Sequence, residues 1–401
     1  MVESQHKWHT IFIAETVSSC NKKRICDLTS LVCYWHEGDS QYNCMMSLNE
    51  KDKASDLNIN FDEWKTDFNK YVVDLREVRS SVMWPKDMHP AVHNPEFSSV
   101  TEASKWLSAR EPLISFTYKG KARGYPLGIL LYHEIANDEV LDMPIAVTYC
   151  PLCNTAVVYN RRVGNRLFSF GVAGVLRRSN LVMYDRTTES WWQQITGQAL
   201  VGEMAGEMLD RLPSQLISFS QFSSVYPKGR ILTPYFWGTN RYYQGYDDTS
   251  PDSRPRYCPE GVDGRFHPAQ RLITLDIDGK YMAYPYSATS KLHVINDEFA
   301  GRQIVVFHSG GALSPVDDYE IAKSREVGST GVFNRNADDE TLSFSYRDGM
   351  FADDQTSSLW DITGRCIEGK LEGRRLEQVV HGNDFWFVWI TFHPDSEIFQ
   401  S

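Results

Sequence analysis

An internal repeat constrains the fold of this chain more than any other feature of its sequence. The segment Gly120-Lys-Ala-Arg-Gly-Tyr-Pro126 returns as Gly279-Lys-Tyr-Met-Ala-Tyr-Pro285. Other correspondences follow along the chain: Asn137-Asp-Glu139 with Asn296-Asp-Glu298, Ile145 with Ile304, Ile195-Thr-Gly197 with Ile362-Thr-Gly364, and Gly202 with Gly369. Because turn, strand and glycine positions all repeat, we expect two copies of one α+β unit, near residues 110–232 and 270–399.

Capping and turn signals predict the secondary structure of the first copy. A capping box at Ser99 and Glu102 favours a helix over 99–109. Pro126 suits the first turn of a helix that ends near 137–138, and a third helix is expected over 214–226. Apolar and β-branched runs favour strands at 113–118, 145–149, 156–159, 167–172, 181–184 and 198–201.

These elements define a β-rich α+β fold of two pseudo-repeated units with an N-terminal extension. The expected boundaries are an extension over 1–85, a first repeat over 86–232, an irregular connection over 233–269, and a second, degenerate repeat over 270–401. The connection is rich in Tyr, Asp, Pro and Arg, and we expect its aromatic side chains to hold it on the body of the protein.

Composition and charge restrict the class of partner. The formal net charge of -11 argues against a general nucleic-acid binder, because phosphate contacts need a basic surface. No apolar run has the length of a membrane span, and the first residues make a poor signal peptide, so we expect a cytoplasmic protein without a membrane partner. No phosphate-binding glycine loop is present, so no nucleotide cofactor is expected. The oligomeric state cannot be predicted from these features.

The differences between the copies indicate where the chemistry lies, since a residue that the fold needs should recur. Cys150 and Cys153 of the first copy correspond to Ser309 and Ala312 of the second. Glu134 corresponds to His293, and residues 176–189 have no full counterpart. We therefore expect the first copy to carry the site and the second to support it.

The pair Cys150-x-x-Cys153 admits four interpretations. It is a redox dithiol, a thiolate metal site completed by His133, Glu134 or His308, a nucleophile with His133 as its base, or a pair of buried core thiols. Soft sulfur ligands favour copper or zinc, with iron as a further candidate. A lone CxxC pair lacks the second pair of ligands that a structural zinc site needs.

Four more cysteines, Cys20, Cys26, Cys33 and Cys44, lie close together near the N-terminus, with spacings that match no zinc motif. Cys258 and Cys366 complete the eight. In a long chain without an evident signal peptide, free thiols or metal ligands are expected over disulfides.

Polar residues around the CxxC pair supply the other candidates. Tyr149 and Cys150 are catalytic candidates, with Glu134 and Asp185 as proton-transfer or ligand-orienting groups. Arg123 and Arg186 would orient an anionic part of a small-molecule substrate, and Glu189 is a third candidate for contact with the substrate. A salt-bridged surface is the alternative for these charges.

Three long motifs resemble the domain-of-unknown-function family numbered 3179, from about residue 90 to about 399. They are Thr148-Tyr-Cys-Pro-Leu-Cys153, the segment from Tyr125-Pro126 to His133-Glu134, and the segment from Leu181 to Trp192. Asn154, Ala173 and Asn180 stand where the family usually has Gly, Ser and Asp. The resemblance implies a site at these motifs and names no reaction.

The leading hypothesis is a metal-dependent enzyme, redox in character, that acts on a small molecule. In it, Cys150 and Cys153 are thiolate ligands and His133 or His308 completes the site. One alternative is a metal-free thiol enzyme with Cys150 as nucleophile or redox thiol. The other is a metal-binding or carrier protein without catalysis.

Overall fold

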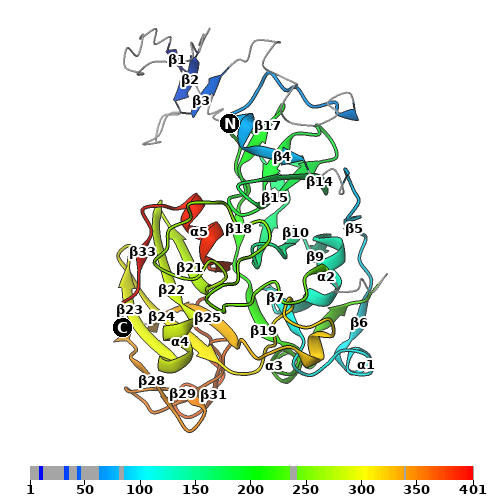
Figure 1. Ribbon diagram of the computed structural model, residues 1–401. Helices are drawn as coiled ribbons and strands as arrows, with labels where there is room; N and C mark the ends of the chain where they lie inside the picture. The colour runs from blue at the N-terminus through cyan, green and yellow to red at the C-terminus, as the bar shows by residue number, and fades with distance from the viewer. Residues whose placement is uncertain are drawn as a thin grey trace, which may run out of the picture.

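The chain folds into antiparallel β-sheets with a few short helices, as the predicted β-rich α+β class requires. The computed structural model describes the strands 9–11, 31–35 and 43–46 together with residues 63–80, 85–234, 242–337 and 340–400. Figure 1 shows the sheets of the first half of the chain, in cyan and green, beside those of the second half, in yellow to red. Cys20 and Cys26 lie outside the described residues, and for Cys33 and Cys44 only the backbone is described, in β2 (Leu31–Trp35) and β3 (Asn43–Met46).

Three sheets build the first half. One runs β18 (Arg211–Leu212), β11 (Thr155–Asn160), β10 (Met143–Cys150), β9 (Ile135–Val140), β5 (Val92–His93). The second runs β17 (Ala199–Val201), β16 (Trp191–Gln193), β15 (Asn180–Asp185), β14 (Phe170–Arg177), β4 (Val78–Ser80). The third runs β19 (Gln215–Ser218), β7 (Pro112–Tyr118), β8 (Lys121–Pro126), β20 (Arg230–Leu232), β6 (Phe97–Ser99). A small hairpin, β12 (Arg162–Val163) with β13 (Arg166–Leu167), projects from them.

Three further sheets build the second half. One runs β32 (Gly382–Phe385), β21 (Arg271–Ile277), β22 (Lys280–Pro285), β33 (Glu397–Ile398). Another runs β23 (Val294–Phe299), β24 (Arg302–Ser309), β25 (Ser329–Asn334). The last runs β28 (Phe344–Arg347), β29 (Met350–Asp353), β30 (Leu359–Trp360), β31 (Cys366–Glu368). The strands β26 (Asn336–Ala337) and β27 (Glu340–Thr341) form a hairpin.

The order of elements is the same in the two halves. The run β7, β8, α2 (Leu127–His133), β9, β10, β11 is matched by β21, β22, α4 (Tyr286–Leu292), β23, β24, β25, and each element has as many residues as its counterpart. Specific hydrogen bonds also recur. The Tyr125 hydroxyl donates to Asp138 and the Tyr284 hydroxyl to Asp297, over 2.6 and 2.7 Å.

The helices are shorter than the sequence predicts. The capping box of Ser99 and Glu102 is present, but α1 covers only Val100–Ala103. Helix α2 ends at His133, because Glu134 takes the left-handed conformation (φ +56°) and turns the chain into β9. Residues 215–218 form β19, which pairs with β7, so α3 is limited to Phe219–Val225 behind its cap Ser218. At α2 and α3, part of the predicted helix pairs as a strand, which helix signals do not encode. Helix α1 is followed by turns.

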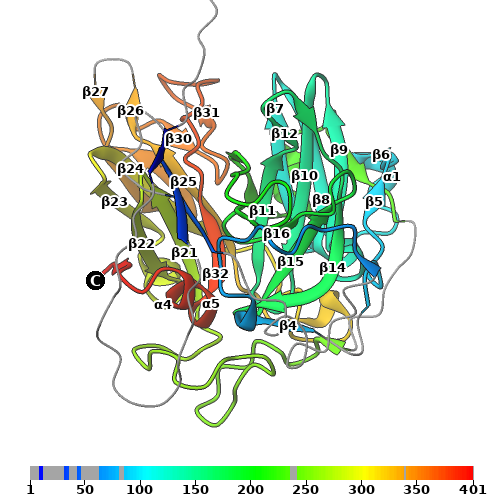
Figure 2. The same cartoon turned by 90° about the horizontal axis from the view of Figure 1, so that it is seen from above.

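Figure 2 shows the two halves side by side, and hydrogen bonds between polar side chains join them. The Thr155 hydroxyl donates to Asp384 of β32 over 2.6 Å, and the Thr274 hydroxyl donates to the other oxygen of that carboxyl group over 2.5 Å. On the other side of the junction, the Ser329 hydroxyl donates to Gln221 over 2.6 Å. In each half, the first residue of one strand therefore hydrogen-bonds the other half. These residues are Thr155 of β11 and Ser329 of β25.

The segment 63–80 packs against the sheet of β14 to β17. Strand β4 pairs with β14, and the rings of Trp64 and Phe68 each lie 5.2 Å from that of Trp191 in edge-to-face contacts. Such contacts add to the apolar area that the segment buries. This part of the predicted N-terminal extension is thus an added layer on the first half.

A buried carboxyl group, Glu111, lies beneath the first turn of α2. It accepts a hydrogen bond from the Gly128 backbone over 3.2 Å, and its burial raises its pKa to about 7. The corresponding position of the second half holds Gln270. The folded state therefore keeps a proton on Glu111 at pH values where the unfolded chain has lost it.

We predict that Glu111→Gln removes a pH-dependent loss of stability. Folding raises the pKa of Glu111 from 4.5 to about 7. The contribution of protonated Glu111 to the free energy of unfolding is therefore complete below pH 4.5 and is lost as the pH rises towards 7. The loss is about 3 kcal/mol for a group this buried. Denaturant unfolding should find the variant more stable than the wild type at pH 8 and close to it at pH 4.5. An equal difference at both pH values would contradict the assignment.

Candidate functional site

The two cysteines of the CxxC motif lie in the tight turn between β10 and β11. Cys150 is the last residue of β10, and the Cys153 backbone N–H donates to the Cys150 carbonyl over 3.2 Å. Asn154 closes the turn in the left-handed conformation (φ +55°), which Asn tolerates better than most residues. Both thiols are free and buried, with 1% and 0% of the residue exposed. The chain thus places two reduced thiols in one turn of the interior.

The surroundings of Cys153 disfavour its ionisation. Its thiol donates to the Ser179 carbonyl over 3.1 Å. Burial raises the pKa of Cys153, and the hydrogen bond with the thiol of Cys150 raises it further, while the side chain of Asn180 acts in the opposite direction. The pKa of Cys153 is therefore well above that of an ordinary thiol, and its proton is engaged by the Ser179 carbonyl.

The turn that carries the thiols is attached to the second half of the chain. The Asn154 side chain donates to the Asn383 carbonyl over 2.8 Å. The backbone N–H of Phe385 donates to the Cys153 carbonyl over 2.9 Å. The conformation of the CxxC turn thus depends on β32 as well as on β10 and β11.

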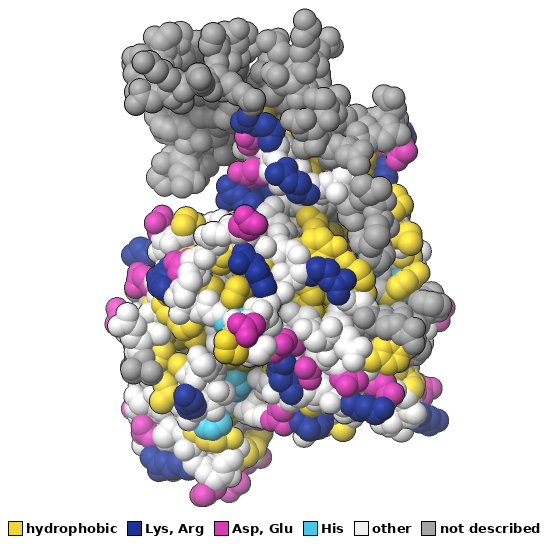
Figure 3. Space-filling view, viewed as in Figure 1, with side chains coloured by type: hydrophobic (Ala, Val, Ile, Leu, Met, Phe, Trp, Pro, Cys, Tyr) yellow, Lys and Arg dark blue, Asp and Glu magenta, His cyan; other side chains and the backbone are white. Residues whose placement is uncertain are grey.

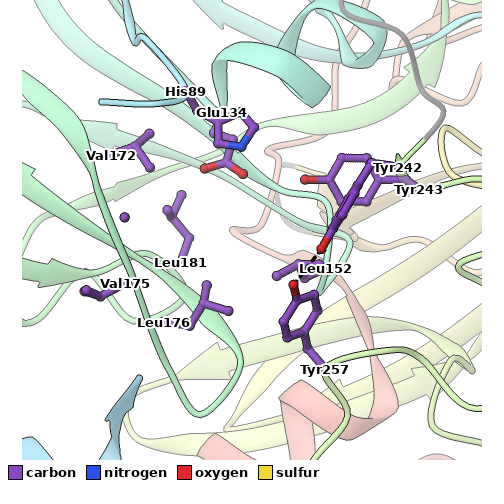
Figure 4. A pocket seen from close by; sticks show the side chains of 11 residues that line it. His89, Glu134, Leu152, Val172, Val175, Leu176, Leu181, Tyr242, Tyr243 and Tyr257 are labelled. Carbon is purple, nitrogen blue, oxygen red and sulfur yellow. Dashed lines mark hydrogen bonds between the residues drawn. The ribbon is translucent and has the colours of Figure 1, made fainter. Parts of the chain in front are cut away.

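A small cavity of about 50 Å³ lies beside the turn (Figure 4). It is lined by Leu152, which lies between the cysteines in sequence, by Glu134, and by residues from the hairpin of β14 and β15 and from the connection between the halves. The other lining residues are His89, Val172, Gly174, Val175, Leu176, Leu181, Tyr242, Tyr243 and Tyr257. The cavity is therefore mostly apolar, with one carboxyl group, one imidazole and three phenols on its wall.

Glu134 reaches the cavity from the C-terminal end of α2. Its left-handed backbone is a feature of the fold, because His293 at the end of α4 has the same conformation (φ +62°). The chemistry differs, however. The His293 ring hydrogen-bonds the His308 carbonyl over 3.0 Å, whereas the carboxyl group of Glu134 lines the cavity. Burial raises the pKa of Glu134, so the group favours its protonated form more than an exposed glutamate does.

The hairpin that forms one wall is longer in the first half than in the second. Strands β14 and β15 span residues 170–177 and 180–185, whereas β28 and β29 span 344–347 and 350–353. The register of the longer hairpin shifts between Val172 and Leu176, and Gly174 takes a positive φ of 76° there. Bulges of this kind redirect a strand and are frequent beside functional sites. The bulged residues Val172, Gly174 and Val175 all face the cavity.

The opposite wall comes from the connection between the halves, whose role in the site the sequence did not reveal. The Tyr242 and Tyr257 hydroxyl groups are 2.5 Å apart, and Tyr243 is buried between the cavity and the turn of the cysteines. An ion cluster fixes the connection: buried Asp247 accepts hydrogen bonds from Arg271 and Ser314 and pairs with Arg325, over 2.6, 2.7 and 2.9 Å. The only signal in the sequence was the density of tyrosines in this stretch.

The predicted metal ligands are not brought together. The Nδ1 atom of His133 hydrogen-bonds the Pro90 carbonyl over 2.7 Å. His308 lies in the second half, where its Nδ1 hydrogen-bonds the Thr289 hydroxyl over 2.8 Å and burial lowers its pKa to about 4. In the part of the chain that the structure describes, no three His, Cys, Asp or Glu side chains are grouped to hold a metal ion. Neither histidine therefore completes a site with the cysteines.

Asp185 has a role in the fold that the repeat reveals. It accepts hydrogen bonds from the Thr188 hydroxyl and the Trp192 indole, over 2.7 and 3.0 Å. Asp353 accepts the same two bonds from Thr356 and Trp360, over 3.0 and 2.9 Å. Residues 185–192 thus have counterparts in the second half, and the segment that the second half lacks is the tip of the β14 and β15 hairpin. The expectation that 176–189 has no full counterpart holds only for its first part.

The predicted substrate-binding charges lie away from the cavity wall and are paired. Arg186 forms an ion pair with Asp87 over 2.8 Å, and Glu189 forms one with Lys86 over 2.9 Å. Arg123 lies over the ring of Phe97, with its Nε 3.8 Å from Asp138. Figure 3 shows basic and acidic side chains interspersed over one face of the molecule.

Tyr149 is buried beside the thiols without lining the cavity. Its hydroxyl donates to the Asn154 side chain over 3.3 Å, and burial raises its pKa far above the ordinary value. Its ring thus stays neutral and supports the CxxC turn. Of the predicted site residues, the structure brings Cys150, Cys153, Tyr149 and Glu134 together at this turn and its cavity.

The fold and the site define a β-rich α+β protein with a buried dithiol beside an apolar cavity. Over residues 86–396 the chain matches the family described as "Protein of unknown function (DUF3179)", and it belongs to this family. The resemblance seen in the sequence motifs is thereby confirmed. Comparison with curated proteins and with solved structures gives no match. Among the described residues, no helix is both long enough and apolar enough to cross a membrane.

We predict that Asp185→Asn and Asp353→Asn weaken the protein to a similar extent. Each replacement puts an amide nitrogen where two donors meet one carboxylate oxygen, at a cost of about 1–3 kcal/mol. Denaturant unfolding measures the loss, and alkylation of Cys150 in the folded variants should proceed as in the wild type. Slower thiol chemistry in the Asp185 variant alone, at equal stability, would restore a catalytic role for this residue.

Proposed function

We propose that this chain is a thiol-dependent redox protein whose Cys150 and Cys153 cycle between a dithiol and a disulfide. The observation that carries the proposal is the pair of buried free thiols in one turn, directly beside a cavity that holds a carboxyl group. Oxidation forms one S–S bond and releases two protons and two electrons. A small disulfide is the acceptor class that balances this step, because it takes up both electrons and both protons to give two thiols.

Within this function the two cysteines have different roles. We assign Cys150 as the attacking thiol, because the surroundings raise the pKa of Cys153 and keep its proton in place. Cys153 then resolves the mixed disulfide, as a second thiol in the same turn is suited to do. The carboxyl group of Glu134 lies on the cavity wall and can donate or accept a proton.

The matching order of elements supports the further proposal that the two halves are copies of one unit. Under it, the domain boundaries are those expected from the sequence, and the first copy retains the chemistry. The second copy has His308 and Ser309 where the first has Tyr149 and Cys150, and both join ordinary hydrogen-bond networks. Free thiols are typical of a reducing compartment, so we also propose a cytoplasmic location.

A second candidate function is the binding of a soft metal ion, as in the leading hypothesis from the sequence. In this version Cys150 and Cys153 are the two protein ligands. The surroundings raise the pKa of Cys153, and the Asn180 side chain offsets this only in part, so a bound metal ion would have to displace the proton of Cys153. Two neighbouring thiolates suit a soft monovalent ion such as copper(I) better than zinc, which prefers four ligands. Anaerobic copper(I) titration against a chelator tests it. One ion bound per chain, lost in Cys150→Ser and kept in His133→Ala and His308→Ala, would support this candidate.

We predict that redox buffers of graded potential convert the wild type between two defined states. Alkylation of the remaining thiols and peptide mass spectrometry should show Cys150 and Cys153 disappearing together. Cys150→Ser and Cys153→Ser should abolish this transition, because neither can form the internal disulfide.

Cys366→Ser is the matched control, because Cys366 is also free and buried but lies in β31 of the second half. It should keep the transition at the wild-type potential. Free thiols at both Cys150 and Cys153 across the whole range of potentials would refute the proposed function.

A further inference from the structure

We propose that the cavity beside the CxxC turn binds a small, uncharged disulfide with methyl-sized substituents, and that Glu134 protonates the thiolate that leaves. This inference rests on the proposed dithiol function and specifies its substrate class. It names a role for the one acidic side chain on the cavity wall.

The volume of the cavity limits the size of the substrate. Its volume of about 50 Å³ compares with roughly 10–15 Å³ for each water-sized occupant measured in the same way. There is room for about four small atoms. Dimethyl disulfide, with two carbons and two sulfurs, matches this limit, whereas a peptide-linked disulfide such as oxidised glutathione greatly exceeds it.

The residues that line the cavity limit the charge of the substrate. None of the eleven lining residues is Lys or Arg, and five are aliphatic side chains from the turn and the bulged hairpin. A carboxylate on the substrate would lose its hydration here without gaining a cationic partner, which costs several kcal/mol. An ammonium group would meet only the carboxyl group of Glu134, whose pKa is raised by burial towards its neutral form. The anionic substrate expected from Arg123 and Arg186 therefore does not fit this cavity.

The three tyrosines favour sulfur over other small apolar groups. Tyr242, Tyr243 and Tyr257 form one wall, and Figure 4 shows their rings grouped on the side opposite Val172, Val175 and Leu181. Divalent sulfur makes favourable contacts with aromatic rings.

Glu134 stands where a departing thiolate needs a proton. Figure 4 shows its carboxyl group beside the His89 ring, directed into the cavity. Burial raises the pKa of Glu134, which keeps a proton available for transfer. The left-handed backbone at the end of α2 fixes this position, since any residue there projects from the same point.

The reaction then balances in two steps. The Cys150 thiol gives its proton to solvent and attacks one sulfur of the substrate as the thiolate, so that a mixed disulfide forms and one methanethiolate leaves with the proton of Glu134. Glu134 then regains a proton from solvent. The Cys153 thiol next attacks the sulfur of Cys150, forming the internal disulfide. The second methanethiolate takes the proton of Cys153. In sum, the protein loses two hydrogens and the substrate becomes two molecules of methanethiol.

Leu152 separates the cavity from the sulfurs. It lines the cavity, whereas neither cysteine does. The side chain must turn aside before the substrate touches Cys150. Leu152→Ala should therefore speed the reaction, and Leu152→Ile, which keeps the bulk, serves as its matched control.

The test compares rates of oxidation of the full chain by small disulfides, each normalised to the rate with free dithiothreitol. Dimethyl disulfide is the neutral probe, cystamine the cationic probe and 3,3′-dithiodipropionate the anionic probe. We expect the neutral probe to be favoured by at least about 10-fold, given the desolvation that the charged probes suffer. Glu134→Gln should slow it by about 100-fold, the size of a general-acid effect.

The pH dependence of the rate and a second variant test whether Glu134 is the proton donor. The ratio of wild-type to Glu134→Gln rates should shrink as the pH rises, because Glu134 then loses the proton that it donates. Glu134→Asn, which suits the left-handed backbone, should show the same loss if the first variant folds poorly.

Two kinds of failure are distinguishable. Equal normalised rates for neutral and charged probes, or faster oxidation by hydrogen peroxide than by dimethyl disulfide, would overturn this inference. The dithiol function would survive if redox buffers still form the internal disulfide. Absence of that disulfide under every oxidant would overturn both.

Discussion

The carboxyl group of Asp384 is the contact on which the architecture of the site depends. It accepts a hydroxyl from each half, Thr155 beside the CxxC turn and Thr274 in β21, and it is 1% exposed. Buried carboxyl groups are costly unless their hydrogen bonds are satisfied. The pairing fixes the register of β32 against the turn, and the neighbouring residues Asn383 and Phe385 then bind Asn154 and Cys153. The geometry of the thiols is therefore a property of the whole chain.

Much of the fold follows from local signals. The repeat, the strands around Ile145 and Leu181, and the capping box at Ser99 were all readable, because alternation, turns and caps depend on neighbouring residues. The lengths of the helices could not be predicted from the sequence, because Glu134 ends α2 by a backbone conformation that side-chain patterns do not specify. Strand β19 was missed because its pairing with β7 joins residues far apart in the sequence.

The site was predictable in part, for the same reason. Comparing the copies singled out Cys150, Cys153 and Glu134, and the structure brings these three residues to one turn and one cavity. It could not find Tyr242, Tyr243 and Tyr257, since an irregular connection has no counterpart to compare. It also assigned chemistry to Asp185, because the shorter hairpin of the second half shifted the alignment and hid Asp353. A three-dimensional counterpart was needed to recognise Asp185 as a turn residue.

The ion cluster of Asp247, Arg271 and Arg325 has an evolutionary consequence. Because it draws the connection across the first half, one wall of the cavity is encoded outside either repeat. Tyrosines there can change without disturbing a sheet, whereas the thiols and Glu134 are tied to turns that the fold requires. Under the proposed function, selectivity for the bound molecule and the reactivity of the sulfurs are thus encoded in separate parts of this chain, so that the first can change while the second is kept.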